Sequence, residues 1–458
     1  MRNTSRLLDI IDRAHSGPAC EEKDFDLKHV AAGVSRVIKE YDIRFDKARI
    51  IQTDDDMIDR VWQAALDFLA ACGVYCTSTR RRMVFSRREM EEAIRAAPSE
   101  VTIGDGRDVR VLRARTVEDR LPPQVSGGPI GTNLSPENYV AIMQSYAQEP
   151  IIDLVVPGTI VRTHGREVRS KSPLEILASW EEVEMVFSAL RRAGRPGLAS
   201  MGVEMAMSEI GHLSAISRGG YRPTDVQIAA LIGELKTNYE LLNKVAHTIM
   251  TDGILLGFYN PILGGLAGPE EGLAVLITAG MIALQLVYMP ASVCTCPTHP
   301  FLFCDTAPAI LRALSVYAAA VARNSQLLTE VMTSPVGGPC TETVLFESTA
   351  MATIASVCGV SRALGVRSAV GVVEDHCTGL EARFNGEVAH AAAGLPREQA
   401  DEIVRKAVAK YEPLLPTRPV GLPFAQAYDP VTVRPARQWL EIYDRVREEV
   451  AGWGLPLQ

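Results

Sequence analysis

From Gln124 onward, short apolar runs alternate with longer segments in which apolar and polar residues recur at helical spacing. Apolar runs without polar alternation are typical of strands that are buried on both faces, as in a parallel sheet. This pattern predicts strands at 124–128, 152–161, 197–203, 253–258, 291–296, 330–334 and 367–373. It predicts helices between them, at 174–193, 224–248, 270–287, 307–324 and 342–364.

Repeated alternation of strands and helices implies a parallel sheet with right-handed crossovers. Seven strands are distinct in the pattern and an eighth is not resolved, which favours closure into a (β/α)8 TIM barrel over an open sheet. We therefore predict an α/β chain in which residues 121–458 form the barrel. A helix expected at 436–451 covers the barrel near the C-terminus.

The residue pattern of 1–120 differs from that of the rest of the chain, because this segment is rich in charged residues and in helix signals. Three aspartates at 54–56 precede an apolar helical pattern, and acidic residues are favourable at the positive end of a helix dipole. No catalytic constellation is visible there. We interpret this segment as a helical extension that packs on the barrel or forms an oligomer contact.

Composition excludes several classes of function. Of the 458 residues, 47% are hydrophobic and 22% are charged, as in globular proteins with a large core. The net charge of −8 argues against a nucleic-acid surface. Gln285 interrupts the most apolar stretch, 272–287, which is shorter than the roughly 18 residues expected of a membrane span. Nine cysteines without a signal-peptide pattern indicate reduced thiols and a cytoplasmic protein.

The stretch at 194–215 carries the clearest functional signal. A Gly-Arg-Pro-Gly turn at 194–197 leads into a predicted strand that ends at Met201, and Gly202 breaks it. Glu204 follows in the connecting loop. Because the active sites of α/β barrels lie where the strands end, we expect Met201 and Glu204 at the mouth of the barrel.

The chain resembles the monomethylamine methyltransferases of methylotrophic methanogens from end to end. The resemblance rests on the order and spacing of short motifs: Asp-Arg-Ala at 12–14, Gly-Val-Tyr-Cys-Thr at 73–77, Ser-Gly-Gly-Pro at 126–129, Lys-Ser-Pro at 171–173, Gly-Arg-Pro-Gly at 194–197, Gly-Gly at 264–265, Gly-Pro-Cys-Thr-Glu at 338–342, Thr-Gly-Leu-Glu-Ala-Arg at 378–383 and Gly-Glu-Val-Ala at 386–389. It implies transfer of a methyl group from a small methylated substrate to the Co(I) corrinoid of a cognate corrinoid protein that docks over the barrel mouth. It further implies a homo-oligomer, a hexamer in that family, with no tightly bound cofactor of its own.

The resemblance also assigns site positions. The position that matches Met201 holds pyrrolysine in the family, and the ring imine of pyrrolysine captures methylamine. Two glutamates and a glutamine that surround it match Ile228, Phe258 and Met332 here, and Glu204 matches a further family glutamate. Four polar or reactive positions have thus become apolar, so we expect a methyl donor other than monomethylamine. The alternative is that these are ordinary core residues around a closed pocket.

A second cluster suggests metal chemistry. Cys294 and Cys296 lie two residues apart on a predicted strand, so they point to one face, and His299 and Cys304 follow in the next loop. Two thiolates with a third Cys or His suit a zinc site with one open position. Barrel methyltransferases that act on methanol or thiols resemble this arrangement. Buried cysteines that merely pack as small apolar residues are the alternative.

Three further alternatives remain open at the sequence level. In the first, the chain is a zinc-thiolate methyltransferase for methoxy or methylthio donors. In the second, it is a barrel that binds the corrinoid protein without catalysis. In the third, Met201 replaces a pyrrolysine encoded by an amber codon. The altered residues at the three matching positions argue against that substitution. The sequence alone does not identify the methyl donor.

Overall fold

Eight parallel strands form a closed ring at the centre of the computed structural model, which describes residues 2–202 and 208–457. Along the sheet their order is β10 (Val226–Leu231), β12 (Ile254–Tyr259), β13 (Ser292–Thr295), β14 (Thr329–Met332), β15 (Arg362–Leu364), β5 (Gln124–Gly127), β6 (Leu154–Val155) and β9 (Ala199–Ser200). A parallel bridge between Met201 and Val226 joins the last strand to the first. The predicted (β/α)8 barrel is confirmed.

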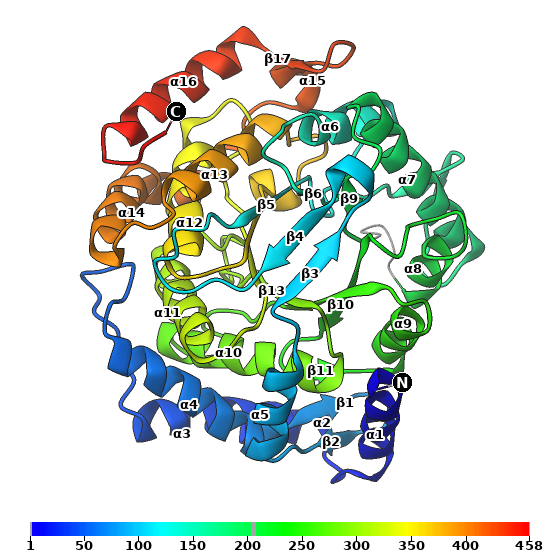
Figure 1. Ribbon diagram of the computed structural model, residues 1–458, viewed down its shortest axis with the longest axis vertical. Helices are drawn as coiled ribbons and strands as arrows, with labels where there is room; N and C mark the ends of the chain where they lie inside the picture. The colour runs from blue at the N-terminus through cyan, green and yellow to red at the C-terminus, as the bar shows by residue number, and fades with distance from the viewer. Residues whose placement is uncertain (1, 203–207, 458) are drawn as a thin grey trace.

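A helix follows each strand and packs on the outside of the ring (Figure 1). These helices are α6 (Pro136–Ala147), α7 (Pro173–Arg192), α8 (Glu209–Ala215), α9 (Tyr239–Met250), α10 (Glu270–Val287), α11 (Pro308–Asn324), α12 (Glu342–Val357) and α13 (Gly379–Ala391). Polar side chains fix several starts: the Asn238 side chain accepts a hydrogen bond from the Leu241 amide, and Thr378 forms a reciprocal capping box with Glu381.

Three predicted elements were wrong. The predicted helix at 224–248 begins only at Tyr239, and its first part is strand β10. The sequence Val-Gln-Ile-Ala-Ala-Leu of β10 is compatible with a helix or a strand, and its pairing with β12 makes it a strand. The predicted helix at 342–364 ends at Val357, and strand β15 follows. The predicted strand at 367–373 is instead a short 3-10 turn, η3 (Ser368–Gly371), with positive φ at its last three residues.

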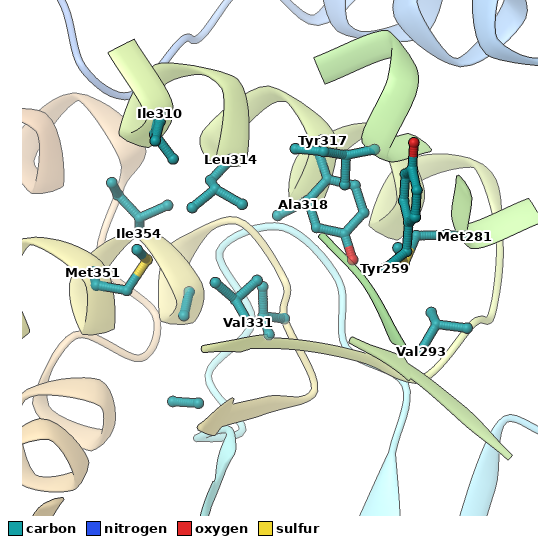
Figure 2. Close-up of a cluster of buried hydrophobic side chains, with 14 of the residues drawn as sticks. Tyr259, Met281, Val293, Ile310, Leu314, Tyr317, Ala318, Val331, Met351 and Ile354 are labelled. Carbon is teal, nitrogen blue, oxygen red and sulfur yellow. The ribbon is translucent and has the colours of Figure 1, made fainter. Parts of the chain in front are cut away.

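Side-chain alternation along the strands separates two cores. One set of residues, including Val293 and Val331, points outward and packs against the helices. Figure 2 shows this layer, where Val293, Val331 and Tyr259 meet Met281, Leu314, Tyr317 and Ile354. The other set points into the ring and forms a separate inner cluster, to which Met201, Cys294, Cys296 and Met332 belong.

The N-terminal segment covers one side of the barrel (Figure 1). It contains α1 (Arg2–Ser16), α2 (Glu22–Asp24), the π-helix η1 (Phe25–Ala31), α3 (Ala32–Glu40), α4 (Asp55–Cys72) and α5 (Arg87–Ala96). Strands β1 (Val74–Cys76) and β2 (Arg81–Met83) add a small sheet with β11 (Lys236–Thr237). This layer packs on the barrel, as one of the two interpretations expected; the boundary at residue 120 stays a prediction.

Helix α10 shows why such a layer is needed. It is 18 residues long and apolar on all sides, so its length and composition alone would suit a membrane span, contrary to the shorter stretch predicted. However, 94% of it is buried inside the protein. Helices α3, α4 and α5 cover the side of α10 that faces away from the barrel. A helix that is apolar all round is explained by burial between two layers.

A hairpin closes the end of the barrel at which the strands begin. Its strands β3 (Glu100–Ile103) and β4 (Arg110–Arg113) cross the centre of the ring in Figure 1. The amides of Gly104 and Asp105 donate to the carbonyls of Thr224 and Gly197, which precede β10 and β9, at 3.1 and 2.8 Å. The carboxyl ends of the strands lie at the opposite end, where active sites of this fold form.

The remaining elements lie outside the barrel. They are the 3-10 turn η2 (Gly106–Asp108), hairpin β7 (Arg162–Thr163) and β8 (Arg166–Glu167), α14 (Arg397–Tyr411), 3-10 helix η4 (Glu412–Thr417), α15 (Phe424–Ala427), hairpin β16 (Tyr428–Asp429) and β17 (Arg434–Pro435), and α16 (Arg437–Ala451). Helix α16 packs against α12, and the Trp439 indole donates to the Thr378 hydroxyl at 3.2 Å. The predicted C-terminal helix that covers the barrel is present.

Candidate active site

A cavity of about 330 Å³ opens at the carboxyl ends of the barrel strands. Most of the residues that line it are apolar, and a few polar residues join them. The lining residues are Ile130, Gly131, Val156, Met201, Ile228, Leu256, Phe258, Asn260, Cys296, Thr298, Phe303, Met332, Leu364 and Arg367. The structure thus brings Met201, Ile228, Phe258 and Met332 together around one space, which argues against a closed pocket.

Met201 is held in place by its backbone. Its amide donates to the Val155 carbonyl at 2.8 Å, and the Gly202 amide donates to the Val226 carbonyl at 2.6 Å. Gly202 has φ of +65°, a conformation that glycine adopts without the penalty of a side chain, so the strand can end there. The Met201 side chain is 1% exposed and belongs to the inner cluster. Its thioether offers no electrophile and no strong hydrogen-bonding group.

Neighbouring strands carry the other three candidate residues. Phe258 on β12 pairs in register with Cys294 on β13, and Met332 on β14 pairs with Leu364 on β15. Ile228 and Phe258 are partly buried at the margin of the inner cluster, and Met332 is buried. Their roles in substrate binding stay predictions. Glu204, the remaining predicted site residue, lies outside the described residues.

Sequence reasoning missed the polar part of the cavity. Asn260 follows β12, and its side-chain oxygen accepts a hydrogen bond from the Cys296 amide at 2.7 Å. Arg367 follows β15, and its Nε donates to the Ile130 carbonyl at 3.1 Å. Thr298 lies in the loop after β13. The sequence pattern predicts a strand at 367–373, which does not place Arg367 at the mouth.

The four predicted zinc ligands do not gather into one site. Cys294 and Cys296 do point to the same side, into the barrel, but Cys304 packs in the outer core against the helices. The Nδ1 atom of His299 accepts hydrogen bonds from the amides of Phe301 and Leu302 at 3.3 and 3.2 Å. Within 2–202 and 208–457, no three His, Cys, Asp or Glu side chains are arranged to hold a metal ion. The zinc prediction therefore has no structural support.

The cysteines are instead buried thiols. Burial raises the pKa of the Cys294 and Cys296 thiols well above its ordinary value, and raises that of Cys304 to about 12. The Cys296 thiol donates to a carboxylate oxygen of Asp305 at 3.4 Å, and the Ser334 amide donates to the other oxygen at 2.8 Å. Burial raises the pKa of Asp305 to about 7.

Exposed apolar side chains lie at the end of the barrel where the cavity opens. They lie on loops that follow three barrel strands: Ile262 after β12, Phe301 and Phe303 after β13, and Val372 after β15. Phe301 is the most exposed of these, at 78%. The Arg418 guanidinium lies over the Phe303 ring, 5.4 Å from its centre. Exposed apolar groups around a site entrance mark a surface that contacts another molecule.

Comparisons with known proteins agree with this architecture over its whole length. The sequence profile described as "Monomethylamine methyltransferase MtmB" matches residues 6–455. Monomethylamine methyltransferase MtmB1 of Methanosarcina barkeri is 32% identical over 98% of this chain and 97% of its own length. MtmB2 of Methanosarcina acetivorans is 33% identical over the same shares.

Solved structures agree as well. The crystal structure of the Methanosarcina barkeri monomethylamine methyltransferase superposes with a TM-score of 0.95 at 32% identity, with 98% of each chain covered. The crystal structure of a hydroxylamine complex of MtmB gives the same TM-score and identity. The chain belongs to the monomethylamine methyltransferase (MtmB) family of corrinoid-dependent methyltransferases.

Proposed function

We propose that this protein transfers a methyl group to the corrinoid of a partner protein from a donor whose methyl group is carried by an uncharged atom, such as a methoxy or methylthio compound. The observation that carries the proposal is the cavity in which Met201, Ile228, Phe258 and Met332 meet. Each of the four presents an apolar or thioether surface where the family resemblance implies a reactive or hydrogen-bonding group.

Monomethylamine suits this cavity poorly. At neutral pH the amine is a cation, and no aspartate or glutamate is among the described residues that line the cavity. Arg367 lines the same space, so its guanidinium would repel an ammonium group. An amine hydrogen that loses its partner on burial costs about 1–3 kcal/mol. A methyl ether or thioether has no such hydrogens to satisfy.

Chain residues contribute by positioning rather than by covalent chemistry. The buried Met201 and Met332 side chains and the partly buried Phe258 would hold the donor and exclude water, so that the methyl group meets the incoming nucleophile in line. As the methyl–cobalt bond forms, the methyl–oxygen or methyl–sulfur bond breaks, and its electron pair leaves with the alkoxide or thiolate, which takes a proton from solvent on release. The corrinoid belongs to the partner and accepts the methyl group as a substrate. The apolar loops that carry Phe301 and Val372 give the partner a surface to dock on.

Monomethylamine itself is the second candidate donor. Its support is that the relatives found by comparison carry the name monomethylamine methyltransferase. If the chain shares that donor, it must activate the amine without an imine at position 201.

A donor panel tests the proposal. The protein is mixed with a corrinoid protein reduced to Co(I), and methylcobalt formation is followed by its visible absorbance. Methoxy and methylthio compounds are added as sole donors in one series and monomethylamine in the other. The proposal expects turnover only in the first series. Turnover with monomethylamine alone would support the second candidate, and none with any donor would favour a non-catalytic barrel.

A further inference from the structure

We propose that the cavity recognises its methyl donor through an anionic group, a carboxylate, that binds the guanidinium of Arg367. This inference rests on the proposed function, because it names the class of donor that the same cavity takes. The donor would then be a small methoxy or methylthio carboxylate. Its anionic end would lie at Arg367, and the apolar wall would hold the remainder.

The position of Arg367 is fixed by its surroundings. Its backbone amide donates to the Thr333 carbonyl at 2.9 Å, and its Nε donates to the Ile130 carbonyl at 3.1 Å. Gly371 leaves the space that the guanidinium occupies, since a Cβ atom on Gly371 would lie 2.6 Å from the Arg367 Cζ atom. When Nε holds a guanidinium in place, its two terminal NH₂ groups can donate hydrogen bonds to a planar acceptor.

Arg367 has no counter-ion among the residues that the structure describes. No ion pair within 2–202 and 208–457 includes it. The two acidic residues later in the same loop are engaged elsewhere: Glu374 accepts from the Asn133 amide group, and Asp375 accepts from Ser135 and Asn138. Asp305 near the cavity accepts from Ser334 and Cys296. A partly buried cation in an apolar wall is stabilised by a ligand that brings the opposite charge.

A neutral group in the same wall adds a donor for an oxyanion. The Asn260 side-chain oxygen already accepts a hydrogen bond from the Cys296 backbone amide. The NH₂ group of the Asn260 side chain therefore points away from that bond and is left to donate. Thr298 also lines the cavity, but its hydroxyl donates to the Cys296 carbonyl at 3.4 Å. A guanidinium and an amide NH₂ are donors that suit a carboxylate.

Binding calorimetry without corrinoid protein tests this inference separately from methyl transfer. The probes are (methylthio)acetate and its neutral analogue 2-(methylthio)acetamide. We expect the unaltered protein to bind the acid at least tenfold more tightly than the amide. Arg367→Gln should abolish this preference and leave the affinity for the amide unchanged, and Arg367→Lys should retain part of it. Arg437→Gln, which removes an exposed cation on α16 that is paired with Glu441 away from the cavity, should change nothing.

Two results would overturn the inference. One is equal affinity of the unaltered protein for the acid and the amide. The other is an equal loss of affinity for both probes in Arg367→Gln, which would give Arg367 a structural role. Thermal unfolding of each variant checks that it folds. If the acid binds as expected but no donor yields methylcobalt, the proposed function fails while the anion site stands.

Discussion

Met201 and Val226 form the parallel bridge that closes the barrel, and the Gly202 amide donates to the Val226 carbonyl at 2.6 Å. Met201, which lines the candidate site, therefore also joins the last strand of the sheet to the first. These bonds involve only the backbone, so the side chain at position 201 is free to differ between relatives while the barrel stays closed. A change of chemistry at this position does not require a change of fold.

The apolar wall predicts the behaviour of a double variant. Phe258→Glu combined with Met332→Gln buries polar groups without partners, each at a cost of about 1–3 kcal/mol. We expect kcat/KM for a methoxy or methylthio donor to fall at least tenfold. Met250→Gln, at a position 73% exposed on α9, serves as the control and should leave kcat/KM unchanged. Unchanged kcat/KM in the double variant would place Phe258 and Met332 outside the donor site.

The separation of the cysteines predicts low zinc content. Because Cys304 packs in a different core from Cys294 and Cys296, and burial favours their neutral thiols, we expect protein purified without chelator to hold well below one zinc per chain. Elemental analysis measures this directly. One zinc per chain that is lost in Cys294→Ser and in Cys296→Ser would restore the zinc-thiolate alternative.

Asp305 predicts how stability depends on pH. Its pKa in the folded protein is about 7, against an ordinary value of 3.8, because it is buried beside Glu347. The folded state therefore binds the proton more tightly than the unfolded state does. This contribution to stability is complete below about pH 4 and is lost as the pH rises through 7.

Thermal unfolding at pH 5.5 and pH 8.5 checks this direction. We expect the Tm to fall between the two, and to fall less in Asp305→Asn, which keeps an acceptor for the Ser334 amide. Glu347 and Glu381 have pKa values raised to about 7 by burial, so part of the fall should remain. Glu92→Gln, in an exposed ion pair with Arg88, should reproduce the unaltered protein. An identical pH response in Asp305→Asn would contradict the assignment.

The apolar rim predicts a docking defect. Phe301→Glu places a charge at the cavity mouth and should weaken binding of the corrinoid protein at least tenfold, because a charge at the centre of an interface must be desolvated. Val431→Glu is a matched control: Val431 is 91% exposed but lies between β16 and β17, away from the mouth. Equal effects of both substitutions on binding, measured by calorimetry, would show that the rim is not the docking surface.

The barrel itself could be predicted from the sequence because its strands are short apolar runs separated by long helices. Strand β10 was missed because its residues Val226–Leu231 also fit a helix, and only pairing with β12 decides between the two. Strand β15 was missed because the pattern of α12 continued into it. Local patterns do not contain the tertiary contacts that settle such ambiguous segments.

The candidate site was predictable only in part. Met201, Ile228, Phe258 and Met332 were reached through the family resemblance, and the structure brings them to one cavity. Arg367 and Asn260 carry no local sequence signal, because an arginine or an asparagine after an apolar run is common on any surface. Their place in the wall follows from the ring of strands, which sets residues more than 100 positions apart side by side.

Methyl transfer from monomethylamine is the measurement that tests the central claim most directly. The protein is incubated with a Co(I) corrinoid protein and monomethylamine as sole donor, beside a parallel reaction with the monomethylamine methyltransferase of Methanosarcina barkeri. With Met201 in place of an imine and Arg367 in the cavity wall, we expect no methylcobalt absorbance from this protein while the parallel reaction proceeds. Methylcobalt formation at a comparable rate would contradict the account.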